Sequence, residues 1–328
     1  MSDDDLLASV KNMDKITNLK SQIDHRAVIA GLGKDQRDFL LERSNGPGLV
    51  RLVAHWGGIL AMGALIMTAV PLWPALLVID GILIVFLFTT LHETIHGTAF
   101  RTGRLNDLVA AVCGFMLLLP PLWFRYFHFA HHRHTHDPER DPELATPKPE
   151  TIAQYAVYLS GLPYWLAQVR SLVRNAAGWC DDEFVPGKAR RKVRDEARFH
   201  LAAYVLLIIG SLVLVNPVLL WLWVVPALLG QPFLRAYLLA EHTLCPHVAN
   251  MLHNSRTTFT NAVIRFVAWN MPYHAEHHAY PAVPFHRLPE FHAITRDHLT
   301  QTERGYHRFH RRLVGSFERP EAGRSRPA

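Results

Sequence analysis

The sequence predicts an all-α integral membrane protein with four transmembrane helices, arranged as two hairpins. Two long apolar stretches and the placement of the basic residues lead to this prediction. Residues 52–100 contain no Lys or Arg, and residues 199–234 contain no charged residue of either sign. Since one transmembrane helix needs about 20 mostly apolar residues, each stretch provides a hairpin of two spans.

The composition excludes several classes of protein. Only 19% of the 328 residues are charged, against roughly 25% in soluble domains, which excludes a disordered chain. The three cysteines stand in unrelated contexts, so neither a disulfide framework nor a zinc ribbon is expected. The net charge is +6, and the basic residues are expected to contact anionic membrane lipid. No nucleic-acid partner is expected.

The first hairpin follows an N-terminal segment. Residues 1–51 are predicted to be cytosolic, and their acidic start is not followed by the apolar stretch of a signal peptide. Spans are expected at about residues 52–70 and 73–91, joined by a tight turn near Pro71 and Pro74. The membrane domain is predicted to cover residues 52–317, and residues 318–328 to form a disordered tail.

The second hairpin is predicted at about residues 199–215 and 217–238, with a break at Asn216-Pro217. All 34 basic residues lie outside the two apolar stretches. Basic loops mark the cytoplasmic side, and a hairpin crosses twice, so both termini are expected in the cytoplasm. The predicted location is a bacterial inner membrane, with the active site on the cytoplasmic side.

One further apolar segment, Leu105–Phe124, resembles a fifth span. It carries a single charge, Asp107, but Pro120-Pro121 interrupts it. The 15 residues before that break form about 22 Å of helix, which is short of the hydrocarbon core of about 30 Å. We therefore expect a re-entrant or interfacial helix.

Histidine is the unusual residue, with 21 copies. Three clusters lie beside the apolar stretches: His92-Glu-Thr-Ile-His96, His128-Phe-Ala-His131-His132 and His274-Ala-Glu-His277-His278. Residues three or four apart share a helix face, so each cluster directs its imidazoles one way. Imidazole binds Fe, Zn, Cu and Ni, and eight such ligands exceed what one ion accepts. The pattern predicts two ions, and iron is favoured.

These clusters resemble the three histidine boxes of the integral-membrane fatty acid desaturase and hydroxylase superfamily, and their surroundings are most similar to bacterial acyl desaturases. The resemblance covers about residues 50–290. It implies a four-span bundle with a cytosolic helical cap holding a di-iron site. It also implies O2 as co-substrate and electrons from a separate ferredoxin or cytochrome b5 type carrier.

Members of this superfamily usually add a ninth imidazole before the third box. His242 is the predicted one, with His247 and His253 as alternatives. The predicted metal ligands are His92, His96, His128, His131, His132, His242, His274, His277 and His278. His134 and His136 are expected to lie outside the ligand set.

Metal-bound imidazoles usually donate their second N–H to a carboxylate or a carbonyl. The carboxylates near enough in sequence are Glu93, Asp137, Asp141, Glu241 and Glu276. Asn270 is a candidate for a contact to an ion through water.

The predicted function is an O2-dependent oxidoreductase of lipid metabolism that introduces a double bond into a fatty acyl chain, presented as an acyl lipid or acyl thioester. The alternative is a hydroxylase or ketolase of a lipid or carotenoid, because the same ligands serve both reactions. A second class is an intramembrane zinc protease, since His92 to His96 also forms the HExxH motif. That hypothesis leaves the other two clusters unexplained.

Overall fold

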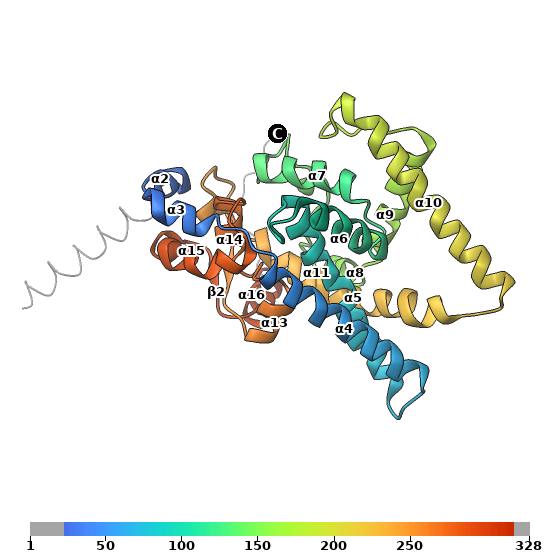
Figure 1. The fold of residues 1–328 in the computed structure, drawn as a ribbon. Helices are drawn as coiled ribbons and strands as arrows, with labels where there is room; N and C mark the ends of the chain where they lie inside the picture. Colours follow the sequence, from blue (N-terminus) through green and yellow to red (C-terminus); the bar gives the residue numbers. More distant parts are fainter. Residues whose placement is uncertain (1–22, 318–328) are drawn as a thin grey trace, which may run out of the picture.

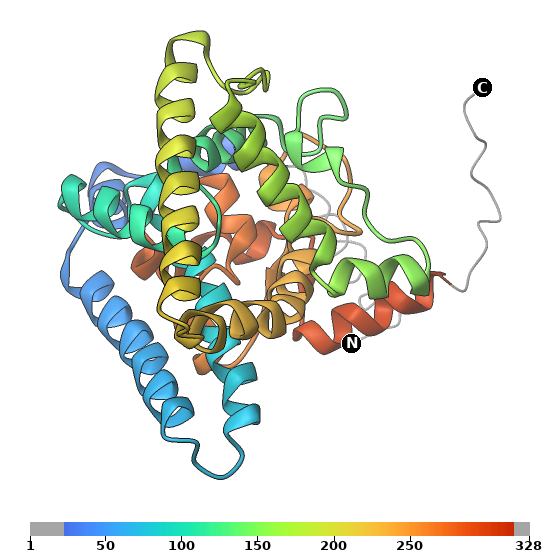
Figure 2. The same ribbon diagram turned by 90° about the vertical axis from the view of Figure 1, so that its right-hand side faces the viewer.

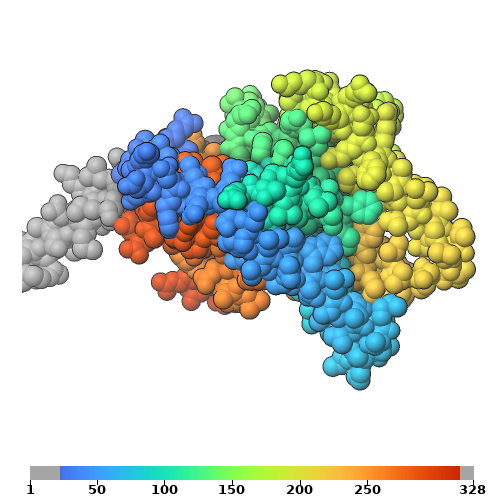
Figure 3. All heavy atoms as spheres, in the orientation of Figure 1, coloured from blue at the N-terminus to red at the C-terminus, as the bar shows by residue number. Residues whose placement is uncertain are grey.

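The computed structural model of the chain describes residues 23–317, and most of them lie in helices (Figure 1). The predicted tail and the first 22 residues of the N-terminal segment lie outside this range. Two short helices, α2 (His25–Ala30) and α3 (Lys34–Leu40), precede the first long one. The N-terminal helices and the C-terminal segments lie side by side (Figure 3), and Asn250 Nδ2 donates to Ile23 O at 3.0 Å.

Four helices of the described chain are long and apolar enough to cross a membrane, which confirms the predicted number. They are α4 (Gly46–Met67), α5 (Trp73–His96), α10 (Arg190–Val213) with the turn η2 (Gly187–Ala189) before it, and α11 (Val225–His242) with the π-helical turn η3 (Leu220–Val224) before it.

The helices extend past the predicted spans at their histidine-bearing ends. α5 continues to His96, where Gly97 ends it in a left-handed conformation with φ of 71°. α11 continues to His242. Hydropathy marks where the apolar residues stop, whereas a helix stops where its backbone is capped, so the two limits need not coincide. The bilayer limits within these helices stay a prediction.

The two hairpins turn at the same end of the molecule. In Figure 1 the loop between α4 and α5 and the loop between α10 and η3 both lie toward the right, away from α14 and α15 on the left, and this right-hand side faces the viewer in Figure 2. α5 and α11 therefore run in the same direction, and both end near the cap.

The glycines Gly81 and Gly230 let α5 and α11 approach closely. A Cβ on Gly81 would lie 2.0 Å from Pro226 O, and a Cβ on Gly230 would lie 2.1 Å from the carbonyl carbon of Gly81. Small residues permit this backbone contact between membrane helices. The crossing fixes how the two histidine-bearing ends face each other.

The fifth apolar segment is broken, as the proline pair predicts. α6 (Gly103–Met116) and α7 (Pro121–His134) meet at an angle of 98°. Each has 14 residues, or about 21 Å of helix, which is less than the hydrocarbon thickness. The bend turns α7, with the second histidine cluster, across the ends of the long helices.

The remaining elements build the cap and its connections. They are η1 (Pro142–Ala145), α8 (Ile152–Leu159), α9 (Leu162–Ala177), α12 (Met251–Asn254), α13 (Ala262–Val267), α14 (His274–Ala279), η4 (Phe285–Arg287), α15 (Leu288–Thr295), η5 (Arg296–His298) and α16 (Tyr306–Phe317). A parallel pair of two-residue strands, β1 (Thr257–Thr258) and β2 (Thr302–Glu303), joins two of these segments. This pair is a small addition to the predicted all-α fold.

Candidate metal centre

The nine predicted ligands come from four helices whose ends meet inside the cap. The last turns of α5 and α11 supply His92, His96 and His242. Helix α7 supplies three more histidines, and the six-residue helix α14 supplies the remaining three. Both long helices present their C-terminal ends, where the helix dipole favours a cation.

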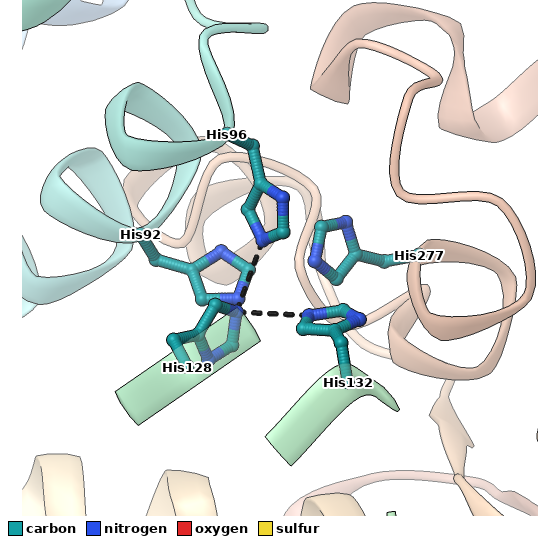
Figure 4. Close-up of side chains that lie close together, drawn as sticks. All are labelled: His92, His96, His128, His132 and His277. Atoms are coloured by element: carbon teal, nitrogen blue, oxygen red, sulfur yellow. Dashed lines mark hydrogen bonds between the residues drawn. The ribbon is translucent and has the colours of Figure 1, made fainter. Parts of the chain in front are cut away.

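Five of the histidines form one group, here called the five-histidine group. Its members are His92, His96, His128, His132 and His277, with one ring nitrogen of each within 4.8 Å of the others. Figure 4 shows the rings turned toward a common space. His128 Nε2 lies 3.0 Å from His96 Nε2 and 2.8 Å from His132 Nε2.

The other four form the four-histidine group. His131, His242 and His278 each place a ring nitrogen within 4.8 Å of the other two. His131 Nε2 lies 3.1 Å from His242 Nε2, and His274 Nε2 lies 2.9 Å from the same atom. All nine candidates are thus brought together, although their role as ligands stays a prediction.

The geometry of both groups fits metal ions. Metal–nitrogen bonds of about 2.1 Å place two neighbouring ligands on one ion about 3 Å apart, close to the separations found here. In addition, both ring nitrogens of His92 and of His277 are buried without a hydrogen-bond partner among the described residues. An unsatisfied buried nitrogen is costly, and coordination would satisfy it.

The third cluster is held in the form that binds metals. Burial lowers the pKa of His277 and His278 well below the ordinary value, and it lowers the pKa of His274 to about 3. These imidazoles are therefore neutral at physiological pH and keep a nitrogen lone pair for coordination.

Two side chains hydrogen-bond predicted ligands through the second nitrogen of the ring, and a third lies close to one. Asp141 Oδ1 accepts from His131 Nδ1 at 2.9 Å, whereas Glu241 Oε1 approaches His274 Nδ1 to 3.4 Å without a hydrogen bond. The hydroxyl of Thr135 lies 3.3 Å from His278 Nδ1. Such contacts fix the ring orientation and the tautomer. Asp141 and Glu241 were among the predicted partners, whereas Thr135 was not.

The other predicted carboxylates serve elsewhere. Glu93 accepts a hydrogen bond from Phe285 N at 2.9 Å, and Glu276 is bound by the Thr257 hydroxyl and His292. Asp137 pairs with Arg140. In these contacts the three carboxylates pair with residues other than the predicted metal ligands.

This position of Glu93 bears on the protease hypothesis. In an HExxH protease the glutamate is the general base for the metal-bound water. Here Glu93 Oε1 is engaged by a backbone N–H, and both flanking histidines belong to a larger group. The surroundings of the motif therefore do not match those of a zincin site.

Neither of the two alternatives for the ninth histidine, His247 and His253, belongs to either group. The His247 ring lies 4.6 Å from the ring of His136, and His136 Nε2 donates to Asn254 O at 2.8 Å. Since His242 contacts both His131 and His274, the geometry favours His242.

Glu143 lies at the four-histidine group and was missed from sequence. Its Oε2 is 3.3 Å from His131 Nε2, and Lys148 Nζ donates to its Oε1 at 2.7 Å. The only local signal is the Asp141-Pro142-Glu143 sequence, which places two carboxylates around one short turn after the second cluster.

Aromatic side chains border the five-histidine group. The ring of Phe124 stacks on His128 with centroids 5.4 Å apart, and Phe129 lies 5.2 Å from the His96 ring. Phe88 lies 6.3 Å from the His92 ring. The group therefore faces an apolar surface, which suits a lipid rather than a polar substrate.

A large apolar cavity of about 750 Å³ lies apart from the histidines, among α9, α10 and α11. Its wall residue Ala227 precedes His242 by 15 residues on α11, or about 22 Å along the helix axis. The cavity thus belongs to the membrane-facing part of the bundle.

Comparison with known proteins adds a family and three relatives. The sequence profile of the fatty acid desaturase family matches residues 68–310. A zeaxanthin 4-ketolase of Chlamydomonas reinhardtii is 25% identical over 225 residues, which cover 64% of this chain and 42% of the relative. Beta-carotene 4-ketolase 3 and a beta-carotene ketolase, both of Haematococcus lacustris, are each 34% identical over 80 residues, covering 23% of this chain and 24% of each relative. The chain thus matches less than half the length of these curated relatives.

Proposed function

The chain belongs to the fatty acid desaturase family, and from this we propose that it is an O2-dependent di-iron oxidase that attacks an unactivated C–H bond of a membrane lipid. The observation that carries the proposal is the meeting of nine histidines, in groups of five and four, beside aromatic side chains. This donor set exceeds what one ion accepts and leaves positions for O2 if it is shared by two ions.

The bound irons would supply the oxidant, using O2, two electrons and two protons for each turnover. Hydroxylation places one oxygen atom into the C–H bond and forms one water. Desaturation removes two hydrogens from neighbouring carbons and forms two waters. A ketone needs two hydroxylations at one carbon and loss of water. The electrons come from a separate carrier, for which the basic surface is the expected docking face.

The residues of the chain would hold the ions, orient the imidazoles and protect the oxidant from water. The nine imidazoles would hold the ions, and Asp141 keeps His131 in one orientation. Burial of the groups excludes bulk water, which protects a strong oxidant from side reactions. Phe88, Phe124 and Phe129 offer the apolar surface on which a hydrocarbon segment of the substrate can lie.

Two substrate classes are supported by different observations. Oxygenation of a carotenoid ring is supported by the three ketolases, of which one aligns with 64% of the chain. Desaturation of a fatty acyl chain is supported by the family match and by the similarity of the three histidine boxes. Both need the same metal centre, and they differ in the C–H bond presented to it and in whether oxygen enters the product.

Expression in a bacterial host that makes β-carotene tests the proposal, with mass spectrometry of carotenoids and of fatty acids from the same cells. A carotenoid that gains oxygen identifies the oxygenase, and an acyl chain that loses two hydrogens identifies the desaturase. If neither lipid class changes while the protein is inserted and carries iron, and a matching electron carrier is supplied, the proposal is wrong.

A further inference from the structure

The two histidine groups are unequal in a way that the nine-histidine pattern does not explain. One ion would receive five imidazoles and the other only four. A fifth donor for the second ion has to come from another side chain or from solvent. Glu143 is a carboxylate positioned at this smaller group.

His131 has a carboxylate at each of its nitrogens. Asp141 Oδ1 lies 2.9 Å from Nδ1, which is the side away from the other rings. Glu143 Oε2 lies 3.3 Å from Nε2, the nitrogen that also faces His242. The two carboxylates therefore occupy different positions, one behind the imidazole and one on its metal-binding side.

A metal ion bound to His131 Nε2 would exclude a hydrogen bond between this nitrogen and Glu143. A coordinated nitrogen carries no proton, so it has none to donate to Glu143. The 3.3 Å separation is also near the distance of about 3 Å expected between two neighbouring ligands on one ion. An ion bound by Nε2 therefore lies within reach of Glu143 Oε2.

Lys148 holds Glu143 in this position. Its Nζ donates to Oε1 at 2.7 Å and leaves Oε2 directed at the histidines. A carboxylate with one oxygen fixed in this way is preorganised to offer the other oxygen to a metal ion.

The sequence offered Asn270 as another donor near an ion, but its amide is engaged. Asn270 Nδ2 donates to Phe285 O at 2.9 Å, and its Oδ1 accepts from Arg51 at 3.2 Å. Within residues 23–317, Glu143 Oε2 contacts His131 Nε2 and has no competing partner of this kind.

We propose that Glu143 is the fifth protein ligand of the ion held by His131, His242, His274 and His278. The inference rests on the proposed di-iron function. It makes the two ions chemically different, because one has only nitrogen ligands from the protein and the other has a carboxylate oxygen as well. Lys148 is a positioning residue that acts through Glu143.

The test is anaerobic titration of the purified, metal-free full-length protein with Fe(II), together with Mössbauer spectra of the ⁵⁷Fe-loaded protein. Glu143→Gln keeps the size of the side chain and removes its charge. We expect the first Fe(II) to bind as in the wild type and the second to bind at least about tenfold more weakly. Only one of the two spectral components should change.

Two matched variants separate coordination from structure. Glu139→Gln changes an exposed carboxylate in the same loop and should leave both ions and both spectra unchanged. Lys148→Met removes the ion pair but keeps the carboxylate, so the second Fe(II) should bind less tightly than in the wild type but more tightly than in Glu143→Gln. If Lys148→Met reproduces the loss seen in Glu143→Gln, or if Glu143→Gln binds two ions with wild-type affinity, the assignment of Glu143 is wrong.

The number of ions bound by the wild type tests the proposed function, separately from the assignment of Glu143. Wild-type protein that binds fewer than two ions would overturn the proposed function and, with it, the site assigned to Glu143. Two ions in the wild type and an unchanged Glu143→Gln would overturn only the ligand assignment.

Discussion

At the scale of single residues, the metal centre depends on which nitrogen of each imidazole is free. His278 shows this clearly, because its Nδ1 faces the Thr135 hydroxyl and its buried Nε2 has no hydrogen-bond partner among the described residues. One nitrogen is thus used for orientation and the other is left for an ion. A metal ligand needs one oriented nitrogen and one free nitrogen, whereas a structural histidine does not.

Replacement of His278 by Ala should remove one ion and abolish activity, because the four-histidine group loses a donor with no neighbour to replace it. We expect the affinity for the second ion to fall at least about tenfold. His134→Ala is the control, since His134 is adjacent to the second cluster but in neither group. Iron content and lipid products of both variants check this, and a fully active, iron-loaded His278→Ala protein would remove His278 from the ligand set.

At the scale of elements, the site depends on the parallel pair α5 and α11. Gly81 and Gly230 allow backbone contact, 15 residues before His96 and 12 residues before His242. These separations correspond to about 22 Å and 18 Å of helix. A small change in the crossing is therefore carried to the ligands at the helix ends.

Gly81→Ala tests whether the crossing of α5 and α11 controls the positions of the histidines at their ends. The new Cβ meets the Pro226 carbonyl, so the helices must separate, and we expect destabilisation of about 1–3 kcal/mol with weaker metal binding. Gly57→Ala is matched, since no atom lies within 4 Å of its added Cβ, and it should be neutral or stabilising by up to about 1 kcal/mol. Thermal unfolding of the two variants in detergent distinguishes them, and equal midpoints would show that the crossing is not tight.

At the scale of the whole molecule, both hairpin loops lie at one end and the two histidine groups lie at the other. Leu72 and Val215, at the two loops, are 79% and 87% exposed. Together with the basic residues near the cap, this arrangement predicts a cytoplasmic centre and two periplasmic loops.

Labelling of intact cells with a membrane-impermeant thiol reagent checks this orientation. The three native cysteines are buried, so single cysteines can be added with little background. Leu72→Cys and Val215→Cys should be labelled from outside, whereas Arg191→Cys, exposed at the start of α10, should react only after lysis. Labelling of Arg191→Cys in intact cells would reverse the predicted topology.

The sequence alone determined the four apolar helices, the break at Pro120-Pro121 and the three histidine clusters. These features are local: hydropathy, proline geometry and helical spacing depend on residues within a few turns of one another. His242 was chosen through the family resemblance and its position just after the second apolar stretch, and the sequence left His247 and His253 open as alternatives.

The tertiary structure decided how the histidines divide and which carboxylates reach them. His277 joins the five-histidine group while its neighbour His278 joins the other, and Glu143 reaches His131 while Glu93 turns to Phe285. These outcomes depend on how α5, α7, α11 and α14 are placed relative to one another. Distances between residues far apart in the chain come from packing, and no local pattern encodes them.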